Sequence, residues 1–204
     1  MSDWPVRLRG VTESVVTTLG PNNRYNVAAL GIHAPSEGAG GDAAENDADS
    51  GHARARTWGR TRTWRNFTER GEGYVQFVRD PVLFVDATMG IREVDDPVLP
   101  DAAAWVRVSV EQTGAGSEGE TQWVDWRLVP VESNVRRRVV PAFDRGYAAV
   151  VEATVAASRL DVDAYDTETL RDRIEYFESV GRRCGGPAVG AAFDRFDELV
   201  DGAE

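Results

Sequence analysis

Hydrophobic and polar residues alternate with a period of two in several segments of the first two-thirds of the chain, which is typical of β-strands. Such strands are expected over residues 73–80, 104–112 and 121–132. In the second of these, Val106, Val108 and Val110 share one face, and Arg107 and Ser109 lie on the other. The alternation predicts strands with one buried face and one face in water.

Turn-forming residues between the alternating segments predict β-hairpins. Residues 13–33 hold two apolar or β-branched runs around a Gly-Pro-Asn-Asn cluster, and GAGSEGE at 114–120 is expected to be the loop of a second hairpin. Pro81 to Met89 is expected to form a short helix or turn. Strands joined by hairpins, without alternation of strand and helix, favour a barrel or sandwich over a doubly wound sheet.

The period changes to that of a helix near residue 144. Helices are expected over 144–160, after Asp166 as N-cap, and after Gly185, Gly186 and Pro187, which interrupt the pattern. The last helix is expected to turn Val189, Phe193, Phe196 and Val200 inward. The sequence therefore predicts a β-rich α+β fold, with a barrel domain over residues 1–140 and a small helical C-terminal region over residues 141–204.

Composition indicates the setting of the protein more than its function. All 23 basic residues are arginine, 34 residues are acidic and the net charge is -11, which is typical of proteins in a salt-rich cytoplasm. Residues 35–53 are mostly Gly, Ala, Ser, Asp and Glu and are expected to be a mobile acidic insertion. The single cysteine, Cys184, excludes an internal disulfide and is expected to be a small core residue near a helix end. No segment resembles a signal peptide or membrane span, so a cytoplasmic location is expected.

An arginine-rich window interrupts the acidic chain. Residues 52–68 contain no carboxylate and five arginines, namely Arg54, Arg56, Arg60, Arg62 and Arg65. Such a cationic region in an anionic protein predicts an anion-binding site, although at least two of the five arginines are expected to be ion-paired on a solvated face. Thr63, Arg65 and Asn66 lie within one helical turn and supply a hydroxyl, a guanidinium and a carboxamide, all suited to phosphate.

No signature of an enzyme that relies on side chains alone is present. The sequence lacks GxSxG, HExxH, GxxxxGK[ST] and a GxGxxG following a strand. His33 ends an expected strand and His52 adjoins the acidic insertion, and neither has a partner that indicates catalysis. No catalytic or metal-ligating residue is therefore assigned, and a catalytic function would need a cofactor.

Three ordered segments carry a resemblance to a known family. They are ESVVTT at 13–18, NVAALGIH at 26–33 and TRTWRNFTERGEGYVQFVRDPVLF at 61–84. Together they resemble the flavin-reductase-type FMN-binding split barrels, and more closely the archaeal DUF447 family, in which such a barrel precedes a small helical region. EATVAASRL at 152–160 resembles the first of those helices. The resemblance implies a split β-barrel of the FMN-binding type, FMN as cofactor, and a homodimer with FMN at the subunit interface.

The resemblance also implies particular site residues. The Thr-Thr strand end of the family corresponds to Thr17 and Thr18, its Asn-x-Ala-x-x-Gly segment to Asn26, Ala28 and Gly31, and its TxxN motif to Thr63 and Asn66. The chain departs from the family at Ala29, where a proline is common, and in its acidic insertion.

The same residues fit FMN by their chemistry. Thr63, Asn66, Arg62 or Arg65 and the free amides of a helix beginning near Thr61 would supply the donors that a phosphate needs. A flat isoalloxazine ring needs a strand edge with small side chains. That edge is expected over Asn26, Val27, Ala28 and Ala29.

The leading hypothesis is a homodimeric FMN-binding flavoprotein that acts as an oxidoreductase, with its substrate and electron donor unidentified. One alternative is a protein that binds FMN or another phosphorylated ligand without turnover. A second is a single-stranded nucleic-acid-binding module, because Trp58, Trp64 and Phe67 interleave with the arginines. The net negative charge disfavours this alternative, and no nucleic acid or membrane partner is expected.

The tryptophans are expected to have different positions. Trp58 and Trp64 are expected at the subunit interface or the flavin edge, and Trp105, Trp123 and Trp126 fit either a core or an interface.

Overall fold

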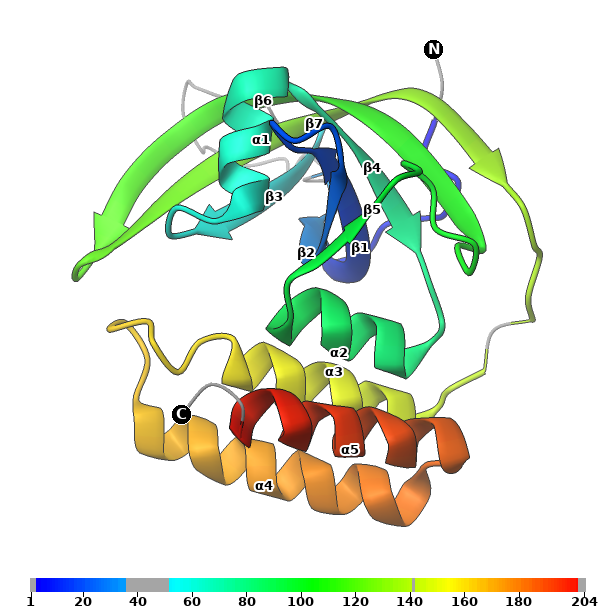
Figure 1. Cartoon of the computed structure of the whole chain (residues 1–204), viewed down its shortest axis with the longest axis vertical. Coiled ribbons are helices and arrows are strands. Elements are labelled where there is room, and N and C mark those ends of the chain that lie inside the picture. Colours follow the sequence, from blue (N-terminus) through cyan, green and yellow to red (C-terminus); the bar gives the residue numbers. More distant parts are fainter. Residues whose placement is uncertain (1–2, 36–51, 141, 202–204) are drawn as a thin grey trace, which may run out of the picture.

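The computed structural model describes residues 3–35, 52–140 and 142–201, so nearly all of the expected acidic insertion lies outside the described residues. Figure 1 shows a β-barrel above a layer of helices, with the N-terminal residues on the barrel and the C-terminal residues in the helical layer. This arrangement confirms the expected order of a β-rich part followed by helices.

Six strands close into an antiparallel barrel, and a short seventh strand extends it. The strands are β1 (Val11–Leu19), β2 (Tyr25–His33), β3 (Ala53–Trp58), β4 (Glu72–Phe77), β5 (Arg92–Val94), β6 (Ala104–Glu118) and β7 (Thr121–Val135). The order around the barrel is β1-β4-β6-β7-β3-β2, and β2 pairs with β1 to complete the ring. Because the ring is closed, most strand edges are satisfied within the barrel.

One seam of the barrel is incomplete. On one side β2 pairs with β1 over nine residue pairs, from Val11↔His33 to Leu19↔Tyr25. On its other side β2 pairs only with β5, over Tyr25–Val27, and with β3 at His33. Within the described ranges, the main chain at 28–32 therefore has no strand partner on that edge, and a ligand can approach it.

The barrel interior is filled by alternate residues of its strands, as the period-two pattern predicts. Its buried side chains include Val16, Val75, Val106, Leu128 and Trp126. Helix α1 (Arg62–Arg70) follows β3 and closes one end of the barrel with Phe67, whose ring meets that of Trp126 edge to face at 5.4 Å. The helix starts near Thr61, as expected, with Thr61 as its N-cap, and Gly71 ends it at a φ of 66°.

Helix α2 (Pro81–Met89) connects the barrel to the remaining helices, below it in Figure 1. Its Leu83 and Phe84 pack against Val15 and Val27 of the barrel, whereas Val85 packs among the C-terminal helices. A helix buried on opposite sides needs apolar residues all round, which explains why PVLFVDATM shows no clear amphipathic period.

The C-terminal layer consists of α3 (Arg145–Ala157), α4 (Thr167–Cys184) and α5 (Pro187–Asp201). Asp144 and Asp166 accept hydrogen bonds from the first-turn amides of α3 and α4, which confirms the expected N-cap at Asp166 and shows a second one at Asp144. None of the described helices combines the length and the apolar character required to cross a membrane.

Two expectations about the helical layer are wrong. Cys184, the last residue of α4, is exposed and is not a core residue. Val200 is 37% exposed, because the inward face of α5 continues from Phe196 to Leu199, which packs against the same core cluster.

The second hairpin differs from its expected form. GAGSEGE is not a loop, because strand continues to Glu118 and the turn is Gly119–Glu120. Gly116 is strand-forming here because its missing side chain leaves room for the Trp123 ring, which a β-carbon would approach to 2.5 Å. Packing of this ring thus overrides the low strand propensity of glycine.

Strands β3 and β5 were not predicted. In β3 the buried positions are Ala53, Ala55 and Thr57, which are too small to give a clear apolar alternation between arginines. Thr57 accepts a hydrogen bond from the Trp126 indole at 2.9 Å, so the strand is fixed by contacts distant in sequence. Ala53 also shows that the expected insertion over 35–53 ends before its predicted last residue.

Two helical glycines give a matched test of the C-terminal packing. A β-carbon at Gly181 of α4 would lie 2.1 Å from the Phe193 ring, whereas one at Gly190 of α5 meets no atom within 4 Å. Gly181→Ala should lower the free energy of unfolding by about 1–3 kcal/mol through overpacking. Gly190→Ala should raise the free energy of unfolding by about 0.5–1 kcal/mol, because alanine loses less conformational entropy than glycine when the helix forms. Urea denaturation of both variants measures the difference, and equal effects would contradict the packing described.

Candidate functional site

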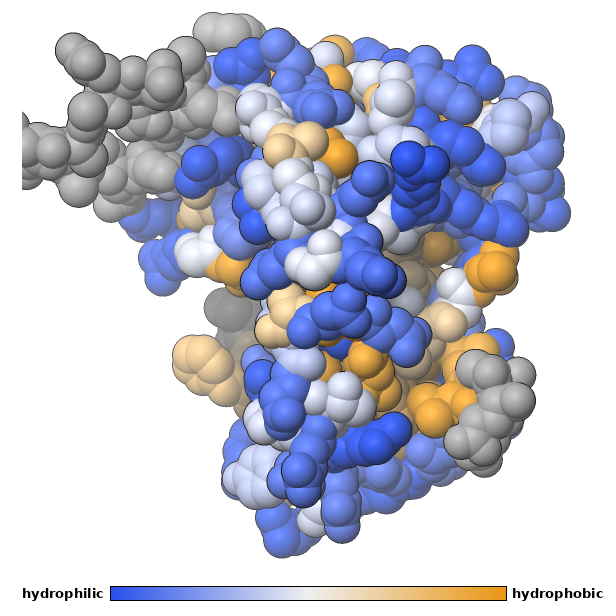
Figure 2. All heavy atoms as spheres, turned by 90° about the vertical axis from the view of Figure 1, so that its left-hand side faces the viewer, coloured by the Kyte–Doolittle hydropathy of each residue, from blue (hydrophilic) through white to orange (hydrophobic). Residues whose placement is uncertain are grey.

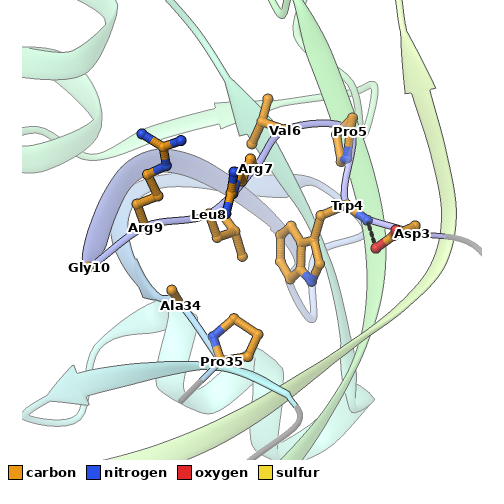
Figure 3. Close-up of a pocket in the computed structure, with 10 residues that line it drawn as sticks. All are labelled: Asp3, Trp4, Pro5, Val6, Arg7, Leu8, Arg9, Gly10, Ala34 and Pro35. Atoms are coloured by element: carbon orange, nitrogen blue, oxygen red, sulfur yellow. Dashed lines mark hydrogen bonds between the residues drawn. The ribbon is translucent and has the colours of Figure 1, made fainter. Parts of the chain in front are cut away.

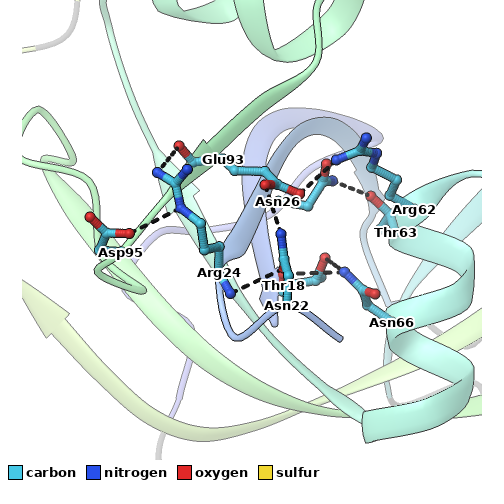
Figure 4. Close-up of polar contacts among 9 residues, drawn as sticks. All are labelled: Thr18, Asn22, Arg24, Asn26, Arg62, Thr63, Asn66, Glu93 and Asp95. Atoms are coloured by element: carbon cyan, nitrogen blue, oxygen red, sulfur yellow. Dashed lines mark hydrogen bonds and ion pairs between the residues drawn. The ribbon is translucent and has the colours of Figure 1, made fainter. Parts of the chain in front are cut away.

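Four polar residues predicted for the site lie together where α1 meets the first hairpin (Figure 4). Asn26 Nδ2 donates to Thr63 Oγ1 at 3.5 Å, and Asn66 Nδ2 donates to the carbonyl and hydroxyl oxygens of Thr18 at 3.2 and 3.0 Å. All four are buried, with at most 6% of each residue exposed. These hydrogen bonds attach α1 to β1 and β2 and so fix the start of α1 relative to the hairpin.

The roles of these four residues differ. Asn66 and Thr18 are hydrogen-bonded to each other inside the protein. The buried Asn66 Oδ1 accepts no hydrogen bond from any described residue. Thr63 also lines a groove on the surface of the barrel. Of the TxxN pair, Thr63 is therefore the residue placed to touch a ligand, and Asn66 is placed to support it.

The two arginines predicted to contact phosphate lie on α1. Arg62 forms an ion pair with Glu93 of β5 at 2.6 Å, and Asn22 donates to the same carboxylate at 2.9 Å. Arg65 Nε is buried and has no acceptor among the described residues. Arg56 pairs with Asp125 at 2.7 Å, so the expectation that at least two window arginines are ion-paired is confirmed.

Thr17 and Val27 point away from the groove. Thr17 Oγ1 donates to the carbonyl of Pro97 and accepts from Gln76 Nε2, which places it in a buried network beside β4. The Val27 side chain is 1% exposed and packs with α2. Thr17 was predicted from the resemblance and Val27 from the need of a flat ring for a strand edge. Neither side chain lines the groove, so these residues can contribute to it only through their main chain or their packing.

The groove has a volume of about 680 Å³, within the range of small-molecule sites. It follows the open seam of the barrel, between the unpaired edge of β2 and β3, and its floor is formed by α2 and the end of α3. Figure 2 views the side of the molecule that is on the left in Figure 1, where hydrophobic residues show in the band between the barrel and the helices. Its lining includes Ala28, Ala29, Gly31, Arg54, Arg56, Trp58, Thr61, Thr63, Phe84 and Arg159.

One end of the groove is suited to an anion. Thr61 and Thr63 line it at the start of α1, a nine-residue helix without an acidic residue in its first turn. The hydroxyl and carbonyl oxygens of Thr61 accept hydrogen bonds from the amides of Trp64 and Arg65. No described residue accepts a hydrogen bond from the amides of Arg62 and Thr63. Two free N–H groups and the positive end of the helix dipole therefore face this end.

The other end contains a carboxylate. Glu13 of β1 lines the groove with Arg159, which follows α3. Burial raises the pKa of Glu13 above its usual value, Arg159 opposes that shift, and Glu152 adds to it. An acceptor and a cation thus lie at the end opposite the α1 amides.

A second cavity of about 780 Å³ lies beside the N-terminal segment (Figure 3). Residues 3–10, Ala34 and Pro35 line it. Figure 3 shows a hydrogen bond there from the main-chain amide of Trp4 to the carboxylate of Asp3. It lacks the buried polar side chains and helix amides found in the groove. The groove is therefore the candidate site.

Two groove residues were not assigned from the sequence. Glu13 and Arg159 lie on segments whose pattern indicates strand or helix, and only the tertiary arrangement brings them together. One signal was available for Glu13, a charged residue on the same strand face as the buried Val15. Among the described residues, no group of three His, Cys, Asp or Glu side chains gathers as in a metal site.

The buried link between α1 and β1 generates a stability prediction. Asn66→Ala should reduce the free energy of unfolding by about 1–3 kcal/mol, because it removes two hydrogen bonds and leaves Thr18 unsatisfied. Asn134→Ala, on an exposed position of β7, should change it by less than about 0.5 kcal/mol. Chemical denaturation compares the two, and a similar small effect for both would show that this link does not hold α1.

Comparison with known proteins agrees with the geometry. Residues 12–137 match the family model "Protein of unknown function (DUF447) N-terminal domain", and residues 144–198 match "Protein of unknown function (DUF447)". An FMN-bound DUF447 protein from Methanosarcina mazei has a similar structure, with a TM-score of 0.72 and 24% identity over 95% of this chain and 96% of that one. This similarity confirms the split-barrel fold.

Other solved structures match more weakly. Nitrilotriacetate monooxygenase component B from Bacillus cereus gives a TM-score of 0.43 at 14% identity, covering 66% of this chain and 74% of that one. The styrene monooxygenase flavin reductase from Pseudomonas putida S12 gives 0.38 at 12% identity, covering 67% and 96%.

Proposed function

The chain belongs to the DUF447 family, and on this premise we propose that it is a flavoprotein that binds FMN in the groove along the open seam of its barrel. The observation that carries the proposal is the position of the α1 start, where two free amides and Thr63 face one end of a groove whose wall is an unpaired strand edge. The FMN-bound protein from Methanosarcina mazei has the same fold, which supports the choice of ligand.

The phosphate of FMN fits the α1 end. The amides of Arg62 and Thr63 and the hydroxyls of Thr61 and Thr63 are donors, and the helix dipole favours negative charge there. Arg56 lines the groove as well, and its pairing with Asp125 fixes its guanidinium near the barrel wall. The hydrogen bond from Asn26 holds the Thr63 hydroxyl oxygen toward β2.

The ring of FMN fits the β2 edge. Side chains along this edge are small, at Ala28, Ala29 and Gly31, so a flat ring can approach the main chain. The edge at residues 28–32 offers main-chain donors and acceptors to the polar side of the ring, while Phe84 of α2 supplies apolar surface.

We further propose that the protein is an oxidoreductase. Bound FMN would supply hydride and electron transfer, and the chain's own residues would bind the phosphate, orient the ring and limit water access from α2 and α3. A binding protein without turnover is the alternative. Mixing the FMN complex with NADH or NADPH in the absence of oxygen, and following the visible spectrum, separates the two.

Nucleic-acid binding is less well supported. Arg56 and Arg62 already pair with carboxylates, so the arginine window offers less free charge than its sequence indicates. The net charge of -11 also disfavours binding of a polyanion such as a nucleic acid.

Phosphate recognition by Thr63 is directly testable. Thr63→Val should weaken FMN binding about ten-fold and leave riboflavin binding nearly unchanged, because only FMN carries the phosphate that the hydroxyl contacts. Thr68→Val is the control, since Thr68 is exposed near the end of α1 and its hydroxyl donates to the carbonyl of Trp64. Quenching of flavin fluorescence measures each affinity. Wild-type protein that quenches neither flavin would refute the proposed function.

The proposal includes a homodimer, supported by exposed apolar residues on β7 and the segment after it. These are Val129, Val131, Val135, Val139, Val140 and Phe143. Val140 is 89% exposed and Phe143 is fully exposed, which is costly unless a second copy covers them. Sedimentation should give about twice the 22.3 kDa chain mass, and Phe143→Ser should shift the equilibrium toward monomer. A wild-type monomer at micromolar concentration would contradict this part.

A further inference from the structure

Glu13 occupies an unusual position on the barrel. It lies near the start of β1, opposite Gly31 of β2, on the strand face that also carries Val11 and Val15. Val15 is fully buried against α2, and Val11 and Glu13 line the groove instead. A carboxylate therefore stands where the strand pattern would place an apolar residue against the helical layer.

The Glu13 carboxylate has no hydrogen bond or ion pair with any residue that the structure describes. It lies beside Gly31, where a β-carbon would come within 3.4 Å of one carboxylate oxygen, so the absent side chain leaves the space that Glu13 uses. A half-buried carboxylate without a donor is costly, because burial removes water and no protein group replaces it.

Other charged groups surround Glu13 from several elements. Arg159 and Glu152 act on it from the α3 side, and Tyr147 of α3 is close enough for Glu13 to contribute to its raised pKa, about 12. His33 of β2 and Arg54 of β3 line the same groove. Arg159 also lies over the ring of Tyr165 at 5.2 Å, which helps to hold its guanidinium at the groove.

The two ends of the groove are well separated along β2. The Asn26 to Thr63 contact marks the α1 end, and the pairing of Glu13 with Gly31 marks the other. These β2 positions are five residues apart, roughly 17 Å at the rise of a β-strand. An extended ligand with an anion at one end therefore presents its other end to Glu13 and Arg159.

We propose that Glu13 and Arg159 recognise the ring end of the ligand, with the Glu13 carboxylate accepting a hydrogen bond from a ring N–H and Arg159 donating to a neighbouring carbonyl oxygen. A ring edge that alternates N–H and C=O groups, such as the imide edge of an isoalloxazine, matches this pair. The inference rests on the proposed function, since it places FMN with its phosphate at α1. It makes Glu13 a specificity-determining residue of the groove.

The proposal has a definite pH dependence. Burial raises the pKa of Glu13 in the free protein, and a hydrogen bond donated to the carboxylate lowers it again in the complex. Binding then releases a proton, so affinity falls as pH falls through the raised pKa and is restored above it. Riboflavin is the probe for this dependence, because the second ionisation of the FMN phosphate near pH 6 would obscure it.

Glu13→Gln tests the carboxylate with little change of shape. Above the raised pKa, the variant should bind riboflavin about ten-fold more weakly than wild type, and the fall in affinity toward acid should be lost. Glu72→Gln is the control, because Glu72 pairs with Arg107 outside the groove. Identical pH profiles for wild type and Glu13→Gln would overturn the proposal.

A ligand variant separates this inference from the proposed function. FMN methylated at the imide nitrogen lacks the ring N–H, so wild type should bind it about ten-fold more weakly than FMN, and Glu13→Gln should show a smaller difference. Equal binding of both flavins to wild type would overturn the role of Glu13 while leaving FMN binding intact. Failure of wild type to bind FMN at all would instead refute the proposed function.

Discussion

The incomplete pairing of β2 is the constraint on which the rest of the structure depends. One edge of this strand is fully paired with β1, while among the described residues the other edge is paired only at its ends, with β5 and by a single pair with β3. Main-chain groups left without partners need another source of hydrogen bonds, which a ligand or water can supply. The same gap lets α2 and the end of α3 form the floor of a groove, so the C-terminal helices take part in the candidate site as well as in the packing below it.

The gap is useful only because α1 is fixed beside it. Asn66 and Asn26 attach the helix to β1 and β2, and the ion pair of Arg62 with Glu93 attaches it to β5. With the helix held at these three points, its unbonded first amides face one fixed end of the groove. Anion binding by a helix start then needs no rearrangement, and the carboxylate of Glu13 at the far end gives the groove two chemically distinct ends.

Much of the architecture could be predicted from the sequence, because long elements with clear periods dominate it. The valines of β6, the Asp166 cap of α4 and the turn of the first hairpin gave reliable local signals. The failures involve tertiary contacts. Ala53 and Ala55 make a strand because their partner β7 carries Trp126, and Gly116 sits in a strand because Trp123 covers it. The site was predicted at its α1 end, where the residues are close in sequence. Its Glu13 end was missed, since β1 and α3 meet there only in the folded chain.

A crystal structure of the protein grown with FMN tests the central claim most directly. The account predicts a phosphate within hydrogen-bonding distance of the Arg62 and Thr63 amides, with the ring lying along residues 28–32 of β2. FMN bound elsewhere, or bound in the groove with its phosphate at the Glu13 end, would contradict the account.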